Sequence, residues 1–194
     1  MQVAVIKYNA GNIKSVLLAL KRLGIEGILT DNPKEILNAD RVIFPGQGEA
    51  KSAMKYLKAR GLDEVIRSIE SPFLGICLGL QLLCSHSEEG DTECLGIFDA
   101  KVKKFPNDLK VPHIGWNIGT LSSSIVFQGI KAPAYFYFVH SYYAEVCTHT
   151  ISQTDYMLPF SNVLQKDNFY AIQPHPEKSA AAGEQFLKNF LFEL

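Results

Sequence analysis

The sequence predicts an α/β fold: a central, mostly parallel sheet with helices on both faces and antiparallel strands added in the second half. In the first half, short β-branched runs alternate with segments of helical periodicity, which is typical of parallel sheets. In the second half, segments that alternate apolar and polar residues are separated by turn residues, which favours antiparallel strands. The final segment, from about residue 179 to residue 192, returns to helical periodicity.

The first half is expected to contain four strands and the helices that follow them. The first helix is predicted from apolar residues at positions 13, 16, 17, 20 and 23, and Gly24 is typical of the position just beyond a helix end. Pro33 is placed to open a short helix, and Gly61 separates two others. The expected strands cover residues 3–6, 25–29, 41–44 and an apolar run from 72 to 76; the expected helices cover residues 13–23, 33–37, 49–59, 62–69 and about 77–90.

Five candidate strands follow in the second half. They cover residues 100–105, 134–139, 142–147, 161–166 and 169–173. Turn residues separate them, for example at 106–108 and 166–168. The sequence shows no internal repeat, low-complexity tract or linker, so we expect a single domain over residues 1–194.

Composition and charge exclude several classes of protein. With 47% hydrophobic and 20% charged residues, the chain of 194 residues is typical of a globular protein with a sizeable core. Lys+Arg 19 against Asp+Glu 20 leaves no positive field for nucleic acid or an anionic membrane. The sequence has no apolar run long enough to span a bilayer and no signal-peptide pattern, so we expect a cytoplasmic protein.

The four cysteines do not form a C-x-x-C pair, and in a reducing compartment we expect no disulfide. Cys84, His86 and Cys94 lie close together in the sequence, but their spacing fits no standard metal site. We therefore expect neither a metal nor another cofactor.

One stretch has the form of a nucleophile site: Gly75-Ile76-Cys77-Leu78-Gly79. It matches the G-x-S-x-G elbow with sulfur in place of oxygen. In such a sharp strand-to-helix turn the backbone segments approach closely, so small residues are needed on both sides of the nucleophile. The turn would place the Cys77 thiol at a helix N-terminus, where N–H groups favour a thiolate. A buried turn with an inert core cysteine has the same pattern, so other residues must decide.

A cysteine nucleophile needs a base and a group that orients that base. Of the five histidines, His175 is the candidate, because it follows a strand and lies between Pro174 and Pro176, which favour extended backbone. Glu177 is two residues further on and in an extended segment projects to the same side. It can then hold one imidazole nitrogen while the other faces the sulfur. A turn histidine beside a solvated glutamate is the alternative.

An oxyanion site needs backbone N–H groups directed at the developing charge. The N–H of Leu78, directly after the cysteine, is one candidate by the geometry of the elbow. Gly46 and Gln47 are candidates for the second donor, because their loop, residues 45–48, ends a strand at the edge where open α/β sheets bind ligands. A plain tight turn has the same composition.

These residues together resemble a known family. The segments Gly75-Ile76-Cys77-Leu78-Gly79-Leu80-Gln81 and Gln173-x-His175-Pro176-Glu177 resemble the class I glutamine amidotransferases, which implies a three-layer fold. Residues 8–16, 112–117 and 137–143 resemble the glutaminase subunits of imidazole glycerol phosphate synthases in particular. The resemblance extends from residue 3 to the last helix.

The resemblance implies hydrolysis of glutamine to glutamate and ammonia. Cys77 would form a glutamyl thioester, His175 would move the proton, and Glu177 would orient His175. The amino-acid end of the substrate would be held by Gln81 and by the backbone of Ser141 and Tyr142, in a pocket lined also by Gly48.

The resemblance also implies a partner. Ammonia would pass to a cyclase subunit, a (β/α)₈ barrel, which forms a heterodimer with this chain in histidine biosynthesis. Asn12, Trp116 and Lys178 match positions near that interface. By residue type alone, Asn12 also suits a helix start, Trp116 suits packing and Lys178 suits a solvated charge. His140 is expected to be structural.

Three positions depart from the family pattern. Pro174 replaces the usual phenylalanine, Gln47 replaces a small apolar residue, and Lys7 replaces a frequent acidic residue. A glutaminase for another pathway and a non-catalytic interaction module of the same fold remain alternatives. The segment 112–117 argues against the first, and an intact Cys77, His175 and Glu177 argue against the second.

Overall fold

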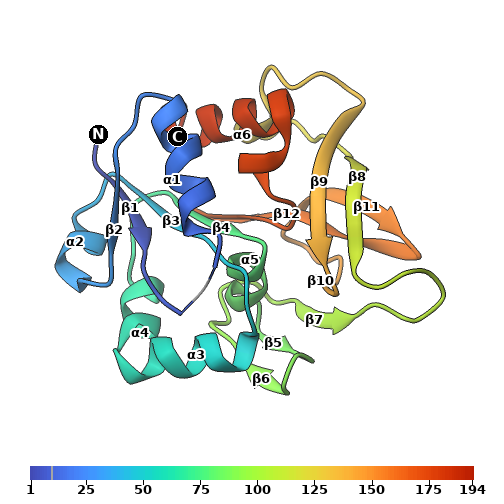
Figure 1. Ribbon diagram of the computed structural model, residues 1–194, viewed down its shortest axis with the longest axis horizontal. Coiled ribbons are helices and arrows are strands. Elements are labelled where there is room, and N and C mark those ends of the chain that lie inside the picture. Colours follow the sequence, from blue (N-terminus) through green and yellow to red (C-terminus); the bar gives the residue numbers. More distant parts are fainter. Residues whose placement is uncertain (10) are drawn as a thin grey trace.

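The computed structural model describes residues 1–9 and 11–194, and within them the core of the fold is a seven-stranded sheet. Its strand order is β11-β12-β13-β4-β3-β1-β2 (Figure 1). The strands β13, β4, β3, β1 and β2 are parallel to one another. β12 pairs antiparallel with β13, and β11 pairs antiparallel with β12. The strands are β1 (Val3–Ile6), β2 (Gly27–Thr30), β3 (Arg41–Phe44), β4 (Phe73–Ile76), β11 (Thr150–Tyr156), β12 (Leu158–Lys166) and β13 (Phe169–Ile172).

Helices cover both faces of this sheet, as the α/β prediction requires. α1 and α6 pack on one face and α3, α4 and α5 on the other, with α2 on the same side as α3 (Figure 1). Every residue of β1, β4 and β13 is buried, because these inner strands are covered on both sides. The helices are α1 (Ile13–Arg22), α2 (Pro33–Leu37), α3 (Ala50–Ala59), α4 (Leu62–Arg67), α5 (Leu78–Leu83) and α6 (Ala180–Phe192).

Two smaller sheets complete the structure. One has the order β10-β7-β5-β6, and the other is the antiparallel ribbon β8–β9. Short 3₁₀ turns, η1 (Ile125–Phe127) and η2 (Pro176–Lys178), precede α6. The strands are β5 (His86–Ser87), β6 (Thr92–Glu93), β7 (Lys101–Lys104), β8 (His113–Gly119), β9 (Ala134–His140) and β10 (Tyr142–Ala144). No helix within the described residues is long and apolar enough to cross a bilayer.

The prediction for the helix after Cys77 was wrong in length. α5 ends at Leu83 instead of continuing to about residue 90. The carbonyl of Leu82 accepts from the N–H of Leu95, and the carbonyl of Leu83 accepts from Ile97 and Phe98. The acceptors that a longer helix would use are therefore taken by a segment more than ten residues away, and the chain continues as β5.

Four strands were not predicted: β5 and β6, which have two residues each, and the longer β8 and β11. β8 contains two glycines and an asparagine, and β11 is mostly polar, so neither has strong strand propensity. Cross-strand pairing with β9 and β12 stabilises them. The segment at 169–173 forms β13, which pairs parallel with β4 and antiparallel with β12.

Candidate active site

Cys77 lies at the turn between β4 and α5, at the carboxyl edge of the central sheet. Its backbone has φ 54° and ψ −105°, which is unusual for a residue with a side chain. A side chain at Gly79 would collide with the carbonyl oxygen of Phe44, and one at Gly75 would come within 2.9 Å of the Gly79 backbone. The two glycines thus allow the sharp turn that the sequence motif predicts.

His175 and Glu177 come from the loop and 3₁₀ turn that follow β13. Both side chains are almost wholly buried, and His175 Nδ1 lies 2.8 Å from Glu177 Oε1. The Nδ1–H therefore donates to the carboxylate, which leaves Nε2 as the other polar atom of the ring. Nε2 is buried and has no hydrogen-bond partner among the residues that the structure describes.

The charges around His175 favour the protonated imidazole. Burial acts to lower its pKa, but a Cys77 thiolate close to the ring and the Glu177 carboxylate outweigh it and raise the pKa to about 10. A cysteine beside such an imidazole can give up its proton to the ring and act as a thiolate.

Asn12 contacts this pair directly, which the sequence did not indicate. Its side-chain amide donates to Glu177 Oε1 and lies 3.4 Å from His175 Nδ1. Asn12 occupies the position before α1 with φ 66°, but its side chain makes no capping hydrogen bond there. The contact spans 165 residues of sequence, so no local pattern could have indicated it.

The Cys77 sulfur has two further polar neighbours. The Val139 carbonyl lies 3.9 Å from Sγ, and the Gln173 amide nitrogen lies 3.7 Å from it. A carbonyl can accept only from the protonated thiol, whereas the amide N–H can donate to sulfur in either state. Gln173 was not among the predicted site residues.

A pocket of about 390 Å³ opens beside Cys77. The structure brings the predicted pocket residues together on its wall and adds Glu89, a carboxylate that sequence reasoning missed. Burial raises the pKa of Glu89, although a hydrogen bond from the Ala50 N–H to its carboxylate opposes that shift. The wall is formed by Gln47, Gly48, Cys77, Leu78, Gln81, Glu89, Pro112, Val139, His140, Ser141 and Tyr142.

The predicted oxyanion donors are close together, but their present hydrogen bonding differs from a formed oxyanion site. The Leu78 N–H donates to the Gly46 carbonyl at 3.4 Å. The loop is tied at two other points: the Tyr8 hydroxyl donates to the Pro45 carbonyl, and the Gly11 N–H donates to the Gln47 carbonyl. An oxygen atom of the loop thus occupies the donor that an oxyanion would need.

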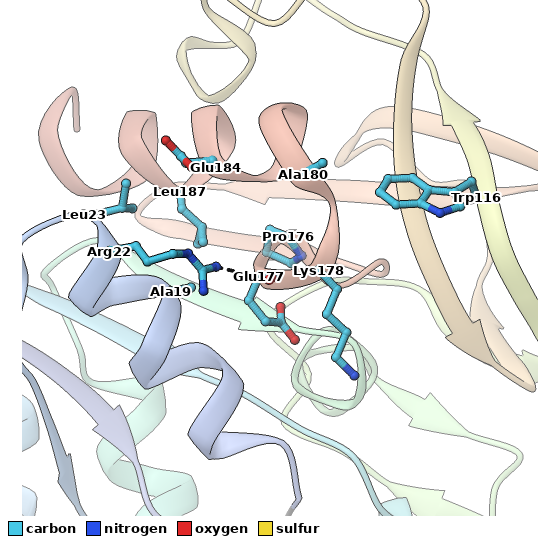
Figure 2. Close-up of a pocket in the computed structure, with 10 residues that line it drawn as sticks. All are labelled: Ala19, Arg22, Leu23, Trp116, Pro176, Glu177, Lys178, Ala180, Glu184 and Leu187. Atoms are coloured by element: carbon cyan, nitrogen blue, oxygen red, sulfur yellow. Dashed lines mark hydrogen bonds between the residues drawn. The ribbon is translucent and has the colours of Figure 1, made fainter.

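Trp116 and Lys178 lie at a second hollow, of about 300 Å³, between α1 and the start of α6. Figure 2 shows Trp116 on the β8–β9 ribbon and Lys178 extending from η2, with Glu177 between Lys178 and Arg22. The Arg22 guanidinium donates to the Glu177 backbone carbonyl at 3.5 Å. The segment 176–178 thus lines this hollow and not the cysteine pocket.

The β8–β9 ribbon has two unlike faces. Toward the core it buries rings from His113, Phe136, Phe138 and His140. The opposite face exposes large apolar side chains where a solvent-facing strand usually has polar ones. Opposing pairs Trp116–Tyr137 and Ile118–Tyr135 form that face together with Ile114, and four of these side chains are at least 44% exposed: Ile114, Trp116, Ile118 and Tyr135.

Pro174 is buried and does not prevent the backbone of His175 from being held. The N–H of His175 donates to the Tyr137 carbonyl at 2.9 Å, and its carbonyl accepts from the Ser179 hydroxyl at 2.7 Å. Ser179 Oγ also accepts from the Tyr137 N–H. These bonds join His175 to β9, the strand that pairs with β8 and places Tyr137 opposite Trp116.

Comparison with known proteins gives a consistent result. The family described as glutamine amidotransferase class-I matches residues 4–194. The imidazole glycerol phosphate synthase subunit HisH of Bacteroides thetaiotaomicron is 55% identical over 98% of this chain and 99% of its own length. The HisH subunit of Yersinia pseudotuberculosis is 45% identical over the same shares.

Solved structures share the fold at much lower identity. A protein described as glutamine amidotransferase has a TM-score of 0.75 at 18% identity, covering 98% of this chain and 97% of its own. A glutamine amidotransferase from Thermotoga maritima has a TM-score of 0.65 at 20% identity, covering 100% of this chain and 84% of its own.

Proposed function

The chain belongs to the class-I glutamine amidotransferases, and from this premise we propose that it is the glutaminase subunit of an imidazole glycerol phosphate synthase in histidine biosynthesis. Two observations together carry the proposal: the 55% identity over nearly the whole chain, and a cysteine on a pocket wall with a buried imidazole–carboxylate pair beside it. Its relatives are named as subunits, so this chain works with a partner subunit.

The proposed reaction uses Cys77 as the nucleophile. Its sulfur attacks the side-chain amide carbon of glutamine, and the thiol proton moves to His175 Nε2. That proton then leaves with the amide nitrogen as ammonia, and a glutamyl thioester remains. Water then adds to the thioester carbon and gives a proton to His175, which passes it to the sulfur as the carbon–sulfur bond breaks and glutamate is released.

Glu177 and Asn12 hold the base in place. With Nδ1–H donated to Glu177, the ring presents Nε2, which is the atom that must exchange a proton with sulfur. The Asn12 amide donates to the same carboxylate oxygen. This bond keeps the carboxylate oriented while the imidazole gains and loses its proton.

The pocket wall fits the amino-acid end of glutamine. Gln81 donates both side-chain N–H groups, to the Tyr142 carbonyl and to Gln173 Oε1, so its Oε1 is the atom left for a ligand. That oxygen and the Glu89 carboxylate are suited to the substrate ammonium. Gly48 and the Ser141 backbone complete the wall, and the side-chain amide of the substrate extends towards Cys77.

The loop at Gly46 is proposed to be a gate. As long as the Gly46 carbonyl accepts from the Leu78 N–H, that donor cannot stabilise a tetrahedral oxyanion. Rotating the peptide between Gly46 and Gln47 would free Leu78 and turn the Gln47 N–H into the site. The isolated chain is then expected to be slow until a partner favours the rotated loop.

The exposed apolar face of the β8–β9 ribbon is the proposed contact with the cyclase subunit, whose expected fold is a (β/α)₈ barrel. Covering it would bury Ile114, Trp116, Ile118 and Tyr135, which monomeric proteins seldom expose together. Lys178 and the hollow in Figure 2 border the same region. Because Tyr137 on this ribbon binds the backbone of His175, partner docking and catalysis share one structural element.

The test is an assay of the complex with its cyclase partner. Cys77→Ala is expected to abolish glutamine-dependent turnover, while added ammonia still supports the cyclase. Cys147→Ala, a half-buried cysteine outside the pocket, serves as the control and should retain both activities. Loss of the ammonia-dependent reaction in Cys77→Ala, or a fast glutaminase in the isolated chain, would contradict the proposed division of labour and the proposed gate, respectively.

A further inference from the structure

Gln173 lies against the reacting sulfur but is not part of the triad. It directly follows β13, its side chain is wholly buried, and Nε2 lies 3.7 Å from Cys77 Sγ. An amide nitrogen can only donate, and sulfur accepts more strongly as a thiolate than as a thiol. The contact therefore favours the charged form of the nucleophile, provided that nitrogen and not oxygen faces the sulfur.

Gln81 decides which atom of Gln173 faces the sulfur. Gln81 Nε2 lies 2.9 Å from the Tyr142 carbonyl and 3.2 Å from Gln173 Oε1. Because a carbonyl can only accept, Gln81 must direct its NH₂ group to these two atoms. Gln173 must then present its oxygen to Gln81 and its NH₂ group to Cys77.

Two histidines form a second series of hydrogen bonds that ends at the same Tyr142 carbonyl. The Tyr142 carbonyl also lies 2.8 Å from His140 Nδ1, so that nitrogen carries the hydrogen. His140 Nε2 is then an acceptor, and His113 Nδ1 donates to it at 3.1 Å. His113 Nε2 is in turn left as an acceptor, with the Asn117 amide nitrogen 3.4 Å away. Each tautomer follows from the carbonyl at the end of the series.

This arrangement requires both rings to be neutral, since a protonated ring would set two donors against each other. Burial lowers the pKa of His113 to about 4 and that of His140 to about 3. Aromatic rings exclude water around the pair: Tyr156 stacks on His113 with centroids 4.0 Å apart, and Phe105 packs against both histidines.

We propose that Gln173 is a further catalytic residue, which donates a hydrogen bond to the Cys77 sulfur and stabilises its thiolate. Gln81 is then a positioning residue that orients the Gln173 amide, and His140 and His113 are positioning residues that hold the Tyr142 carbonyl to which Gln81 is bonded. The proposal rests on the proposed role of Cys77 as nucleophile. Asn117 on β8, the strand that bears Trp116, is the first donor of the histidine series, so this series joins the ribbon to the carbonyl that Gln81 also binds.

The experiment measures the rate of Cys77 alkylation by iodoacetamide against pH in the full chain, with the modified peptide quantified by mass spectrometry. In Gln173→Leu the sulfur loses its donor, and the midpoint of the curve should rise by about one pH unit. Gln173→Glu retains an acceptor for Gln81 but brings a negative charge to the sulfur, so its midpoint should rise further. Gln165→Leu, whose amide binds Ser124 and Tyr170 instead, should leave the curve unchanged.

The same alkylation measurement tests the positioning role of the histidine series, which we call the relay. His140→Phe should raise the midpoint by less than Gln173→Leu, and His140→Asn, which retains a donor near the Nδ1 position, should restore part of the shift. Because the relay acts through Gln173, adding His140→Phe to Gln173→Leu should produce no further shift.

Unchanged midpoints in both Gln173 variants would overturn the proposal, and additive shifts in the double variant would overturn the relay. Thermal unfolding of each variant shows whether the fold is retained, and the conservative Gln173→Glu variant keeps the test available if Gln173→Leu unfolds. The alkylation curve requires no turnover, so its outcome is independent of the Cys77→Ala assay of the complex.

Discussion

His175 and His140 are both buried near Cys77, but their pKa values move in opposite directions. Burial lowers the pKa of each imidazole. At His140, which is bonded to a carbonyl and to another neutral ring, burial prevails and the pKa falls to about 3. At His175 the Cys77 thiolate and the Glu177 carboxylate outweigh burial, and the pKa rises to about 10.

The comparison shows that the charge of the neighbouring groups, and not burial, determines the direction of each pKa shift and therefore the role of each ring. A ring held between a carboxylate and a thiol can carry a proton between reacting atoms. A ring held between neutral groups keeps one tautomer, which suits it to orient the groups it binds. His140 is the last residue of β9 and His175 lies in the loop after β13, and the His175 N–H is bonded to Tyr137 on β9, so one strand supports both environments.

Removing the charge at Glu177 should have the largest effect, because it makes the surroundings of His175 resemble those of His140. Glu177→Gln retains the size of the side chain but lacks the negative charge that favours a protonated imidazole. We expect glutamine turnover by the complex to fall by at least about 100-fold, measured as glutamate formation. Glu184→Gln, at an exposed carboxylate bordering the hollow of Figure 2, is the control. Equal rates in the two variants would contradict the comparison.

Replacing the neutral ring should reduce stability. In His140→Phe the buried Nδ1–H of His113 loses its acceptor, so we expect the free energy of unfolding to fall by about 2 kcal/mol. Urea denaturation measures this change. His149→Phe, at a half-buried histidine beside Phe98, should cost less. A larger loss at His149 would show that the neutral pair does not hold the pocket wall.

Replacing Asn12 tests the His175–Glu177 pair alone, because Asn12 contacts this pair. Asn12→Ala removes one donor to the Glu177 carboxylate, and we expect kcat/KM for glutamine to fall by about tenfold. Asn12→Asp should be worse, because a second carboxylate would face Glu177. The ammonia-dependent cyclase reaction of the same complexes should not change. If it falls in parallel, Asn12 acts through the partner interface and not through Glu177.

The last prediction concerns the pH dependence of stability, which should have opposite signs for the two sites. Below about pH 6.5 the unfolded chain protonates His113 and His140 while the folded chain does not, so stability is lost as the pH falls towards about 4. At His175 the folded chain binds the proton more tightly, so its stabilisation is lost as the pH rises towards about 10.

Urea denaturation across this pH range measures both losses of stability, the acid arm below about pH 6.5 and the alkaline arm towards about pH 10. His113→Gln combined with His140→Gln should flatten the acid arm and leave the alkaline arm in place. If both arms flatten together, the two sites are not electrostatically distinct.

The amino-acid sequence by itself determined the elements whose signals are local. The β-branched runs of β1 and β3 and the apolar spacing of α1 predicted those elements to within one residue. The glycines around Cys77 predicted a sharp turn, because only residues without a side chain permit the close backbone approach found there. The spacing of His175 and Glu177 predicted their contact, but the extended segment expected there is a 3₁₀ turn in the structure.

Tertiary structure alone decided whatever depends on groups distant in the chain. It ended α5 early by giving its carbonyls other donors, placed Asn12 on Glu177, and set Gln173 against the sulfur. It also gave two buried histidines opposite pKa shifts. Hydrogen-bond partners and neighbouring charges act through space, and a single sequence records residue types and spacing but not which distant groups the fold brings together.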